Sequence, residues 1–369
     1  ASAFSYFDNN NSGAYGYFRG QFQNDPTNKK ITVFGYLERR ESTSDYYFRA
    51  ENQTTDNIEL DGGSVFLYEE NRNPSGGVSN PVDNDFHKSV YNSDYDKSEF
   101  CQNCHNLTVD GRDAEITQFE WEGTSFQAMG VECQTCHMPL YSGKAAVTGP
   151  ERDNLHRHFF PGIDEALIDF PGKAEHRLAL EDLLSTAAEI NLFENPPDTI
   201  NADTVWNARF VISNNTGHNF PSGTTFPRQL WMEVFAISND DTLLASGFLD
   251  PRGDIYDFYI DPNRNVDPQL NIFNTILYNA EGDSGLLNVS VENMVKMVNN
   301  TLRVSDSKIV DYMIPIPSGM NGQLELTARL RFRSFPPFYL RHLGLESLIE
   351  NVNIFDIDTI SKTVYVLSN

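Results

Sequence analysis

Two stretches of the chain share the spacing Cys-x-x-Cys-His: they are Cys101-Gln102-Asn103-Cys104-His105 and Cys133-Gln134-Thr135-Cys136-His137. This spacing is typical of the attachment site of a c-type haem. Two thiols three residues apart can each form a thioether with one haem vinyl group, and the adjacent imidazole is then an axial ligand of the iron. The chain has only 4 cysteines, and the two stretches use all of them. We therefore expect two covalently attached haem c groups.

The cysteines allow three other interpretations. A zinc ion bound by all four thiolates fits the spacing of a zinc ribbon, but it leaves His105 and His137 without a role. A thioredoxin-like redox pair needs a βαβ pattern, which neither stretch has around it. A disulfide framework is unexpected in a chain of 369 residues, which is long enough to bury a core of its own.

The composition limits the class of protein. Hydrophobic residues make up 39% of the chain and aromatic residues 12%, which is enough for packed cores. The formal net charge of -25 argues against nucleic acid as a partner, because phosphates repel such a surface. No stretch approaches the ~20 continuous apolar residues of a membrane-spanning helix. Because haem is attached to Cys-x-x-Cys-His outside the cytoplasm, we expect a mature, secreted chain that is extracellular or periplasmic.

Apolar patterning predicts three regions and a mainly β fold. Residues 1–84 are predicted to be β-rich, and 85–197 to form a mostly irregular or α-helical haem-binding segment. Apolar residues at helical spacing predict that this segment closes with a helix over 173–193. Residues 198–369 alternate between apolar and polar positions, which predicts an immunoglobulin-like β-sandwich. Its clearest strands are 205–212, 230–237, 309–316, 324–332 and 363–367.

Each iron needs a second axial ligand opposite its motif histidine. The chain has 8 histidines, and 6 remain once the two motif histidines are set aside. His158, in an aromatic stretch with His156, and His218 lie in loops flanked by Gly and Pro, which let a backbone approach a flat cofactor closely. His176 lies on the predicted helix and His342 follows an arginine, so both are expected to be structural. Bis-histidine ligation of both irons is favoured over methionine as the sixth ligand.

Residues 98–105, 120–139, 158–162 and 217–223 carry four clustered motifs. Together they resemble the motifs of a family of secreted multihaem cytochromes c, in which a haem module precedes a C-terminal β-sandwich. The likeness extends from about His87 to the C-terminus. It implies that His158 is the distal histidine of a His-x-Phe-x-Gly motif and that His87 is the distal histidine preceding the first Cys-x-x-Cys-His. It also implies that His218, in Gly-His-x-Phe-Pro-x-Gly, lies at a haem.

The chain departs from that family in one respect. Its members usually carry an additional Cys-x-x-Cys-His upstream, where this chain has no cysteine. One of His87, His158 and His218 could therefore lack its original iron, or could reach a haem in a neighbouring subunit.

Two further features have competing interpretations. The stretch Asp261–Asp267 places oxygen ligands at alternate positions, as at the start of a calcium loop, but it lacks the expected Gly and closing Glu. A polar turn is the simpler interpretation there, and bound calcium is the alternative. Arg228, Arg331 and Arg333 are candidates to pair with haem propionates, or else lie on the solvent face of strands.

Three functional hypotheses follow. Irons with protein ligands on both sides bind nothing else, so the first is electron transfer outside the cytoplasm, with other cytochromes or extracellular acceptors as partners. The chain would then be a discrete carrier or the subunit of a homo-oligomeric conductive filament, a nanowire. The second hypothesis is a di-haem peroxidase, which needs one open iron site with acid-base groups beside it. The third is a binding module whose sandwich recognises a mineral, a sugar or a partner cytochrome.

Overall fold

The structure is a computed structural model, and the chain divides into two compact units. The first unit comprises Ala1–Cys104 with Leu140–Leu155, and the second comprises His105–Pro139 with His156–Asn369. Up to residue 76 the structure describes only the backbone of strands. The described residues are 4–6, 14–22, 31–39, 46–51, 58–60, 75–82, 89–109, 112–147, 149–162, 164–239, 241–257 and 266–368.

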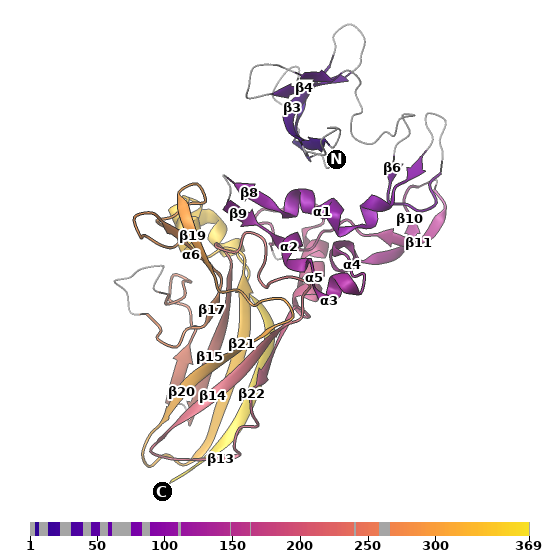
Figure 1. Cartoon of the computed structure of the whole chain (residues 1–369). Helices are drawn as coiled ribbons and strands as arrows, with labels where there is room; N and C mark the ends of the chain where they lie inside the picture. Colours follow the sequence, from indigo (N-terminus) through magenta and orange to yellow (C-terminus); the bar gives the residue numbers. More distant parts are fainter. Residues whose placement is uncertain are drawn as a thin grey trace. The chain divides into compact units, whose positions relative to one another are not determined.

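The first unit contains an antiparallel sheet whose neighbouring strands follow chain order. It is drawn in indigo in Figure 1. These strands are β1 (Phe4–Tyr6), β2 (Ala14–Phe22), β3 (Ile31–Arg39), β4 (Tyr46–Glu51) and β5 (Ile58–Leu60). The same part of the chain has two short ribbons and one turn of 3₁₀ helix. They are β6 (Ser75–Gly76) with β7 (Val90–Tyr91), β10 (Leu140–Lys144) with β11 (Glu151–His156), and η1 (Ser93–Asp96).

Short helices dominate the segment that carries the cysteines. Helix α1 (Ser98–His105) leads from the first unit into the second and is followed by the hairpin β8 (Leu107–Val109) and β9 (Arg112–Glu115). The remaining helices here are α2 (Thr117–Trp121), α3 (Ser125–Ala128), α4 (Cys133–His137) and α5 (Lys173–Leu184). This irregular and helical character agrees with the sequence prediction.

The helix predicted over 173–193 is too long. It ends at Leu184, and Ala188–Leu192 is instead strand β12, paired antiparallel with β14. The apolar residues Ala188 and Ile190 alternate with exposed ones, which is the period of a strand rather than of a helix. Pairing with a long neighbouring strand therefore overrides the helical spacing that the sequence suggests.

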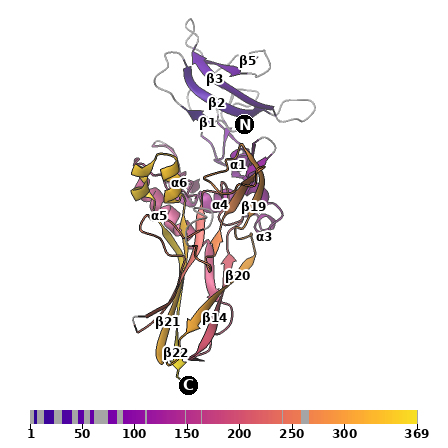
Figure 2. The same cartoon turned by 90° about the vertical axis from the view of Figure 1, so that its left-hand side faces the viewer.

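The second unit is built on a two-layer β-sandwich. One sheet has the order β12-β14-β20, and the other has the order β13-β22-β21-β15-β16 with β17 beside β15. The long strands of both sheets run side by side along this unit in Figure 1, and Figure 2 shows β14 and β20 apart from β21. The strands are β13 (Thr199–Asn201), β14 (Thr204–Asn214), β15 (Gln229–Ser238), β16 (Asp241–Ser246), β17 (Ile272–Phe273), β20 (Ser307–Ile316), β21 (Gly322–Arg333) and β22 (Phe355–Leu367). All five strands predicted from alternation lie within β14, β15, β20, β21 and β22.

The sandwich encloses one hydrophobic core. On β14, β20 and β21 buried side chains alternate with exposed or half-buried ones, so each strand gives one face to the interior. Phe210 and Tyr312 from one sheet and Leu230 and Phe332 from the other belong to the same core cluster and are almost fully buried. Smaller elements complete the unit: β18 (Thr275–Asn279), β19 (Met294–Asn299), α6 (Pro337–His342) and η2 (Glu346–Asn351).

The outer face of β15 is buried over its first half, where Gln229 and Glu233 pair with arginines of the neighbouring strand β21. Directly opposed residues pair Gln229 with Arg333 and Glu233 with Arg329. Glu233 accepts hydrogen bonds from Arg329 at 3.0 Å and from Arg331 at 2.6 Å, while the buried Arg333 donates to Gln229 at 2.6 Å. Arg331 and Arg333 therefore form hydrogen bonds within the sheet, and the buried Arg333 does not lie on a solvent face, which was one of the two roles predicted for it.

The described fold is thus mainly β, as predicted. A sandwich of two sheets follows the region of short helices, and its assignment to the immunoglobulin-like class stays a prediction. No helix in the described part of the chain has both the length and the apolar composition needed to cross a bilayer.

Gly247 provides a test of the packing on the outer face of β15. Its φ is 75°, and a Cβ at this position would lie 2.1 Å from the carbonyl oxygen of Met232. Gly319 has a φ of 76° with nothing within 4 Å of the same built atom. We expect Gly319→Ala to cost about 1 kcal/mol of unfolding free energy for its backbone conformation alone. Gly247→Ala should cost about 3 kcal/mol or more, because the clash adds to that strain. Denaturant unfolding of both variants measures the difference, and equal losses would contradict this packing.

Candidate functional site

Both Cys-x-x-Cys-His stretches are helical. Helix α1 carries Cys101, Cys104 and His105 in its C-terminal half, and α4 consists of the second stretch, Cys133–His137. Residues three apart lie on one face of a helix, so the two thiols of each stretch lie on the same side. Three of the four cysteine residues are half-buried, and Cys136 is exposed.

Four imidazoles hold their Nδ1 atom against an oxygen atom. The pairs are His105 with Glu115 Oε1 at 2.5 Å, His137 with Pro161 O at 2.6 Å, His156 with Met138 O at 2.6 Å and His218 with Asn219 O at 2.7 Å. A carbonyl oxygen or an ionised carboxylate can only accept a hydrogen bond, so the proton of each ring is on Nδ1. The lone pair of Nε2 is then left for another partner.

This arrangement fits the requirements of a haem iron. A metal binds the neutral nitrogen of an imidazole, and a ligating histidine commonly donates its other N–H to a carboxylate or a backbone carbonyl. That hydrogen bond fixes the tautomer and the orientation of the ring. His105 and His137, which directly follow their cysteine pairs, both have Nδ1 bonded in this way. The residues present therefore fit a c-type haem at each stretch.

The rings of His137 and His218 lie close together and nearly parallel. Their centroids are 6.2 Å apart, and the ring planes differ by 19°. Burial lowers the pKa of His218 to about 4 and also lowers the pKa of His137. Both rings are therefore neutral at pH 7, which is the state that a metal ligand requires.

The loop of His218 is tied to the end of the sandwich. It follows β14 and precedes β15. Asn214 Nδ2 donates to the carbonyl oxygen of His218 at 2.9 Å and to that of Leu302 at 3.0 Å. Thr216 Oγ1 donates to the same carbonyl of His218 at 2.6 Å, and Phe220 pairs with Leu302 as an isolated β-bridge. The position of the His218 imidazole therefore depends on the sandwich.

Glu120 on α2 holds the same loop from the helical segment. Its Oε1 accepts a hydrogen bond from Asn219 Nδ2 at 2.7 Å, and its Oε2 accepts from Asn219 N at 3.2 Å and from Ser222 Oγ at 2.5 Å. Burial raises the pKa of Glu120, and these hydrogen bonds oppose that rise. The carboxylate thus anchors the residue that follows His218.

Polar contacts continue from this loop to the first motif histidine. Thr117 Oγ1 lies 2.8 Å from Ser222 Oγ and 3.4 Å from Oε1 of Glu115, the last residue of β9. The Glu115 hydrogen bond raises the pKa of His105. A network of polar contacts with two carboxylates therefore lies between His105 and the loop of His218. Its two hydroxyls have two protons, so only two of its three hydroxyl contacts can be hydrogen bonds at any one time.

Arg228 lies beside this network and is occupied by protein groups. Its Nη2 forms an ion pair with Asp164 at 2.6 Å, and its Nη1 donates to the carbonyl oxygen of Ser222. A Cβ on Gly223 would lie 2.8 Å from Nη1 of Arg228 and 3.5 Å from Oε1 of Glu115. A side chain at position 223 would therefore displace the end of Arg228, whereas its contact with Glu115 would be an ordinary one. Arg228 is thus the one predicted propionate partner that lies at the site.

The other predicted distal ligands have different surroundings. His158 is exposed, and its ring packs edge-on against Phe160 at a centroid separation of 5.7 Å. His87 lies outside the described residues. His176 is on α5, as predicted, and its Nδ1 is buried without a hydrogen-bond partner among the residues that the structure describes.

Three residues of the site are not singled out by the sequence. Glu115 and Glu120 reach the histidines or their loops only in the folded chain. Glu115 lies in no motif, and Glu120 opens the motif at 120–139 without a role assigned to it there. His156 ends β11 and has the same bonded Nδ1 as the motif histidines. Its proximity to His158 in one aromatic stretch is the only signal that the sequence contains.

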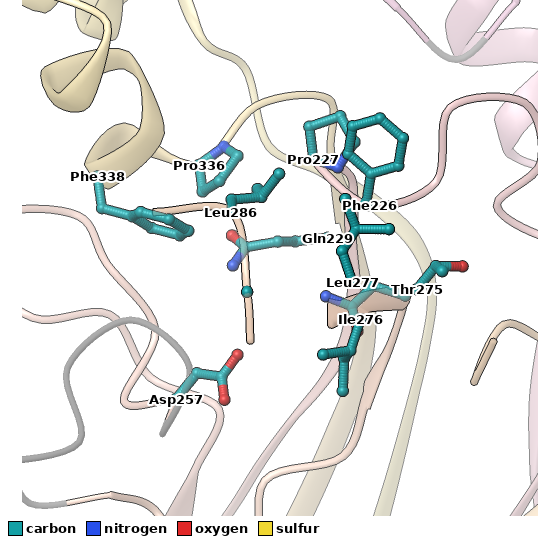
Figure 3. Close-up of a pocket in the computed structure, with 12 residues that line it drawn as sticks. Phe226, Pro227, Gln229, Asp257, Thr275, Ile276, Leu277, Leu286, Pro336 and Phe338 are labelled. Atoms are coloured by element: carbon teal, nitrogen blue, oxygen red, sulfur yellow. The ribbon is translucent and has the colours of Figure 1, made fainter. Parts of the chain in front are cut away.

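A pocket lies elsewhere in the second unit (Figure 3). It is lined by apolar side chains such as Phe226, Leu286 and Phe338, together with the polar residues Asp257 and Gln229. The candidate haem ligands do not line it.

The calcium loop predicted at Asp261–Asp267 lies mostly outside the described residues. Its last residue, Asp267, uses Oδ2 to accept hydrogen bonds from Ser246 Oγ and Gly247 N, both at 2.7 Å. Within the described ranges, no group of three or more His, Cys, Asp or Glu side chains is arranged to hold a metal ion by itself.

Comparisons with known proteins give limited likenesses. No protein-family model matches the chain, and no curated protein matches it either. Among solved structures, a penta-heme cytochrome c552 from Thermochromatium tepidum is 17% identical with a TM-score of 0.49, over 78% of this chain and 62% of that one. The chain therefore spans less than two thirds of that protein.

Two other solved structures are less similar. The sporulation control protein Spo0M from Bacillus subtilis is 6% identical with a TM-score of 0.17, over 50% of each chain. The human F-spondin reeler domain is 13% identical with a TM-score of 0.18, over 49% of this chain and 90% of that one. Because these TM-scores, like that of the penta-heme cytochrome, lie below 0.5, the function has to be argued from the chain's own residues.

Glu120→Ala tests how the His218 loop is held. The substitution removes the acceptor of the Asn219 amide, so hydrogen exchange at Asn219 should become faster by at least about tenfold, the equivalent of ~1.4 kcal/mol. The amide of Phe220 donates to Leu302 O at 2.8 Å and should stay protected in the same sample. Glu122→Ala is the matched control, because the hydrogen bond it removes is with Gln118. Unchanged exchange at Asn219 in Glu120→Ala would show that Glu120 does not anchor the loop.

Proposed function

We propose that this chain is a di-haem c-type cytochrome that transfers electrons outside the cytoplasm. The observation that carries the proposal is the state of the two motif histidines. Each directly follows a helical pair of cysteines, and each has its Nδ1 proton committed to an oxygen, which leaves Nε2 for iron. When bound, haem supplies a one-electron couple whose potential the protein adjusts through its ligands and hydrogen bonds.

The cysteines would hold the two haems. Cys101 and Cys104 would form the thioethers of the first, with His105 as the proximal ligand. Cys133 and Cys136 would form those of the second, with His137 in the same role.

His218 is proposed as the distal ligand opposite His137. A metal–imidazole bond is about 2.0 Å long, and the ring centroid lies roughly 1.1 Å beyond the bonded nitrogen. Two imidazoles on opposite sides of one iron therefore have centroids roughly 6.2–6.3 Å apart. The observed separation of 6.2 Å supports the pairing. His158 and His87 remain the proposed distal candidates for the site of His105.

Ligands on both sides of an iron favour electron transfer over catalysis. A peroxidase needs an open or displaceable position, with an acid-base group beside it. The hydrogen bonds to the His218 loop come from the sandwich and from α2, and they oppose displacement of this imidazole. The acidic surface, with a formal net charge of -25, would suit docking to basic redox partners.

Haem counting tests the proposal. We expect the secreted chain to carry two haems by intact mass and by its pyridine haemochrome spectrum. Replacing Cys101 and Cys104 together with Ser should leave one haem, and so should replacing Cys133 and Cys136, because each pair holds its own group. Gln102→Ala changes a neighbouring position of the first motif and should retain both. A chain that carries zinc and no haem would instead support the zinc-ribbon interpretation.

The proposed function extends to a filament form. A chain with two haems can carry charge over long distances only if copies assemble so that haems meet across subunit contacts. Negative-stain electron microscopy of the secreted protein is expected to show ordered filaments. Discrete particles would leave a soluble carrier and remove the filament from the proposal.

A further inference from the structure

The two motif histidines differ in what accepts their Nδ1 proton, and this difference has a consequence for the irons. We propose that Glu115 makes the His105 site the one with the lower reduction potential. The inference rests on the proposed function, since it concerns haems bound at both stretches. A half-reduced molecule would hold its electron mainly at the His137 site.

The acceptor at His105 is charged, and the acceptor at His137 is not. His105 Nδ1 lies 2.5 Å from a carboxylate oxygen of Glu115, whereas His137 Nδ1 lies 2.6 Å from the backbone carbonyl of Pro161. Charge-assisted hydrogen bonds are roughly twice as strong as neutral ones. A stronger pull on the Nδ1 proton makes Nε2 a better electron donor, which stabilises the oxidised iron and lowers its potential.

The proposed distal ligand of the second site does not change this contrast. His218 Nδ1 also faces a neutral backbone carbonyl, that of Asn219, at 2.7 Å. The carboxylate of Glu120 is one step removed, because it binds the amide groups of Asn219 and the hydroxyl of Ser222. Only the His105 site therefore has a carboxylate hydrogen-bonded to an imidazole among the described residues of these two sites.

Glu115 forms an ion pair with His105, so its negative charge acts mainly on that imidazole. Within the described part of the chain, the one ion pair that Glu115 makes is with His105. Arg228, which lies beside this site, is paired with Asp164 at 2.6 Å, so its charge is already largely compensated. The Glu115 side chain is only 18% exposed, which limits screening by water.

Redox titration of the full-length haem-loaded protein, followed by electron paramagnetic resonance so that each iron is observed separately, tests the proposal. The wild type should show two unequal potentials. Glu115→Gln keeps an acceptor oxygen but makes it neutral, like the carbonyl at His137. The lower potential should rise by about 59 mV, which is a tenfold change in the one-electron equilibrium, while the higher one stays in place.

Two further variants separate the hydrogen bond from other effects. Glu115→Asp retains the carboxylate and should keep the lower potential within a small shift of the wild type. Glu122→Gln changes the net charge equally at a residue bonded to Gln118, and it should move neither potential appreciably. Equal shifts in Glu115→Gln and Glu122→Gln, or a shift of the higher potential alone, would overturn the proposal.

The wild type alone also gives a decisive result. Two coincident potentials would overturn the inference even if no variant folds. A chain that carries two haems but does not respond to Glu115→Gln would refute only the role of Glu115. A chain without haem would refute the proposed function itself.

Discussion

A hydrogen bond from Nδ1 to a fixed oxygen is the constraint on which the candidate site depends. An imidazole has two nitrogens, and it can ligate iron through Nε2 only if the proton resides on the other one. The carbonyls of Pro161 and Asn219 and the carboxylate of Glu115 impose that state on His137, His218 and His105. These acceptors come from a strand end and from loops outside the Cys-x-x-Cys-His stretches, so the surrounding fold has to hold them in place.

The sandwich provides part of that support. The strands β14 and β15 belong to different sheets, and the loop that joins them carries His218. Asn214 bonds this loop back to Leu302, and Glu120 bonds it to α2. The sandwich is thus part of the candidate site, because the loop between two of its strands carries the His218 imidazole. This imidazole lies beside that of His137. Polar contacts reaching from Glu120 to Glu115 then lie between the loop of His218 and His105.

The sequence predicts which residues could attach haem, but it does not predict which contacts hold the candidate ligands in place. Local spacing alone marks both cysteine pairs and their histidines, and strand alternation marks five long strands of the sandwich. The helix over 173–193 was predicted too long, because Ile190 and Leu192 satisfy a helical period and a strand period equally well. Residues 188–192 form a strand because they pair with β14, and this tertiary contact is not contained in the local spacing. The roles of Glu120, Arg331 and Arg333 depend on contacts between distant segments, which no local pattern encodes. The contact of Glu115 with His105 depends on the turn of the β8–β9 hairpin.

The most direct test of the account is the low-temperature electron paramagnetic resonance spectrum of the oxidised, secreted protein. Two histidine-ligated irons predict low-spin ferric signals from both haems, unchanged when cyanide or peroxide is added. A high-spin signal that responds to either reagent would show an open iron position. That result would contradict electron transfer as the function and favour a di-haem peroxidase.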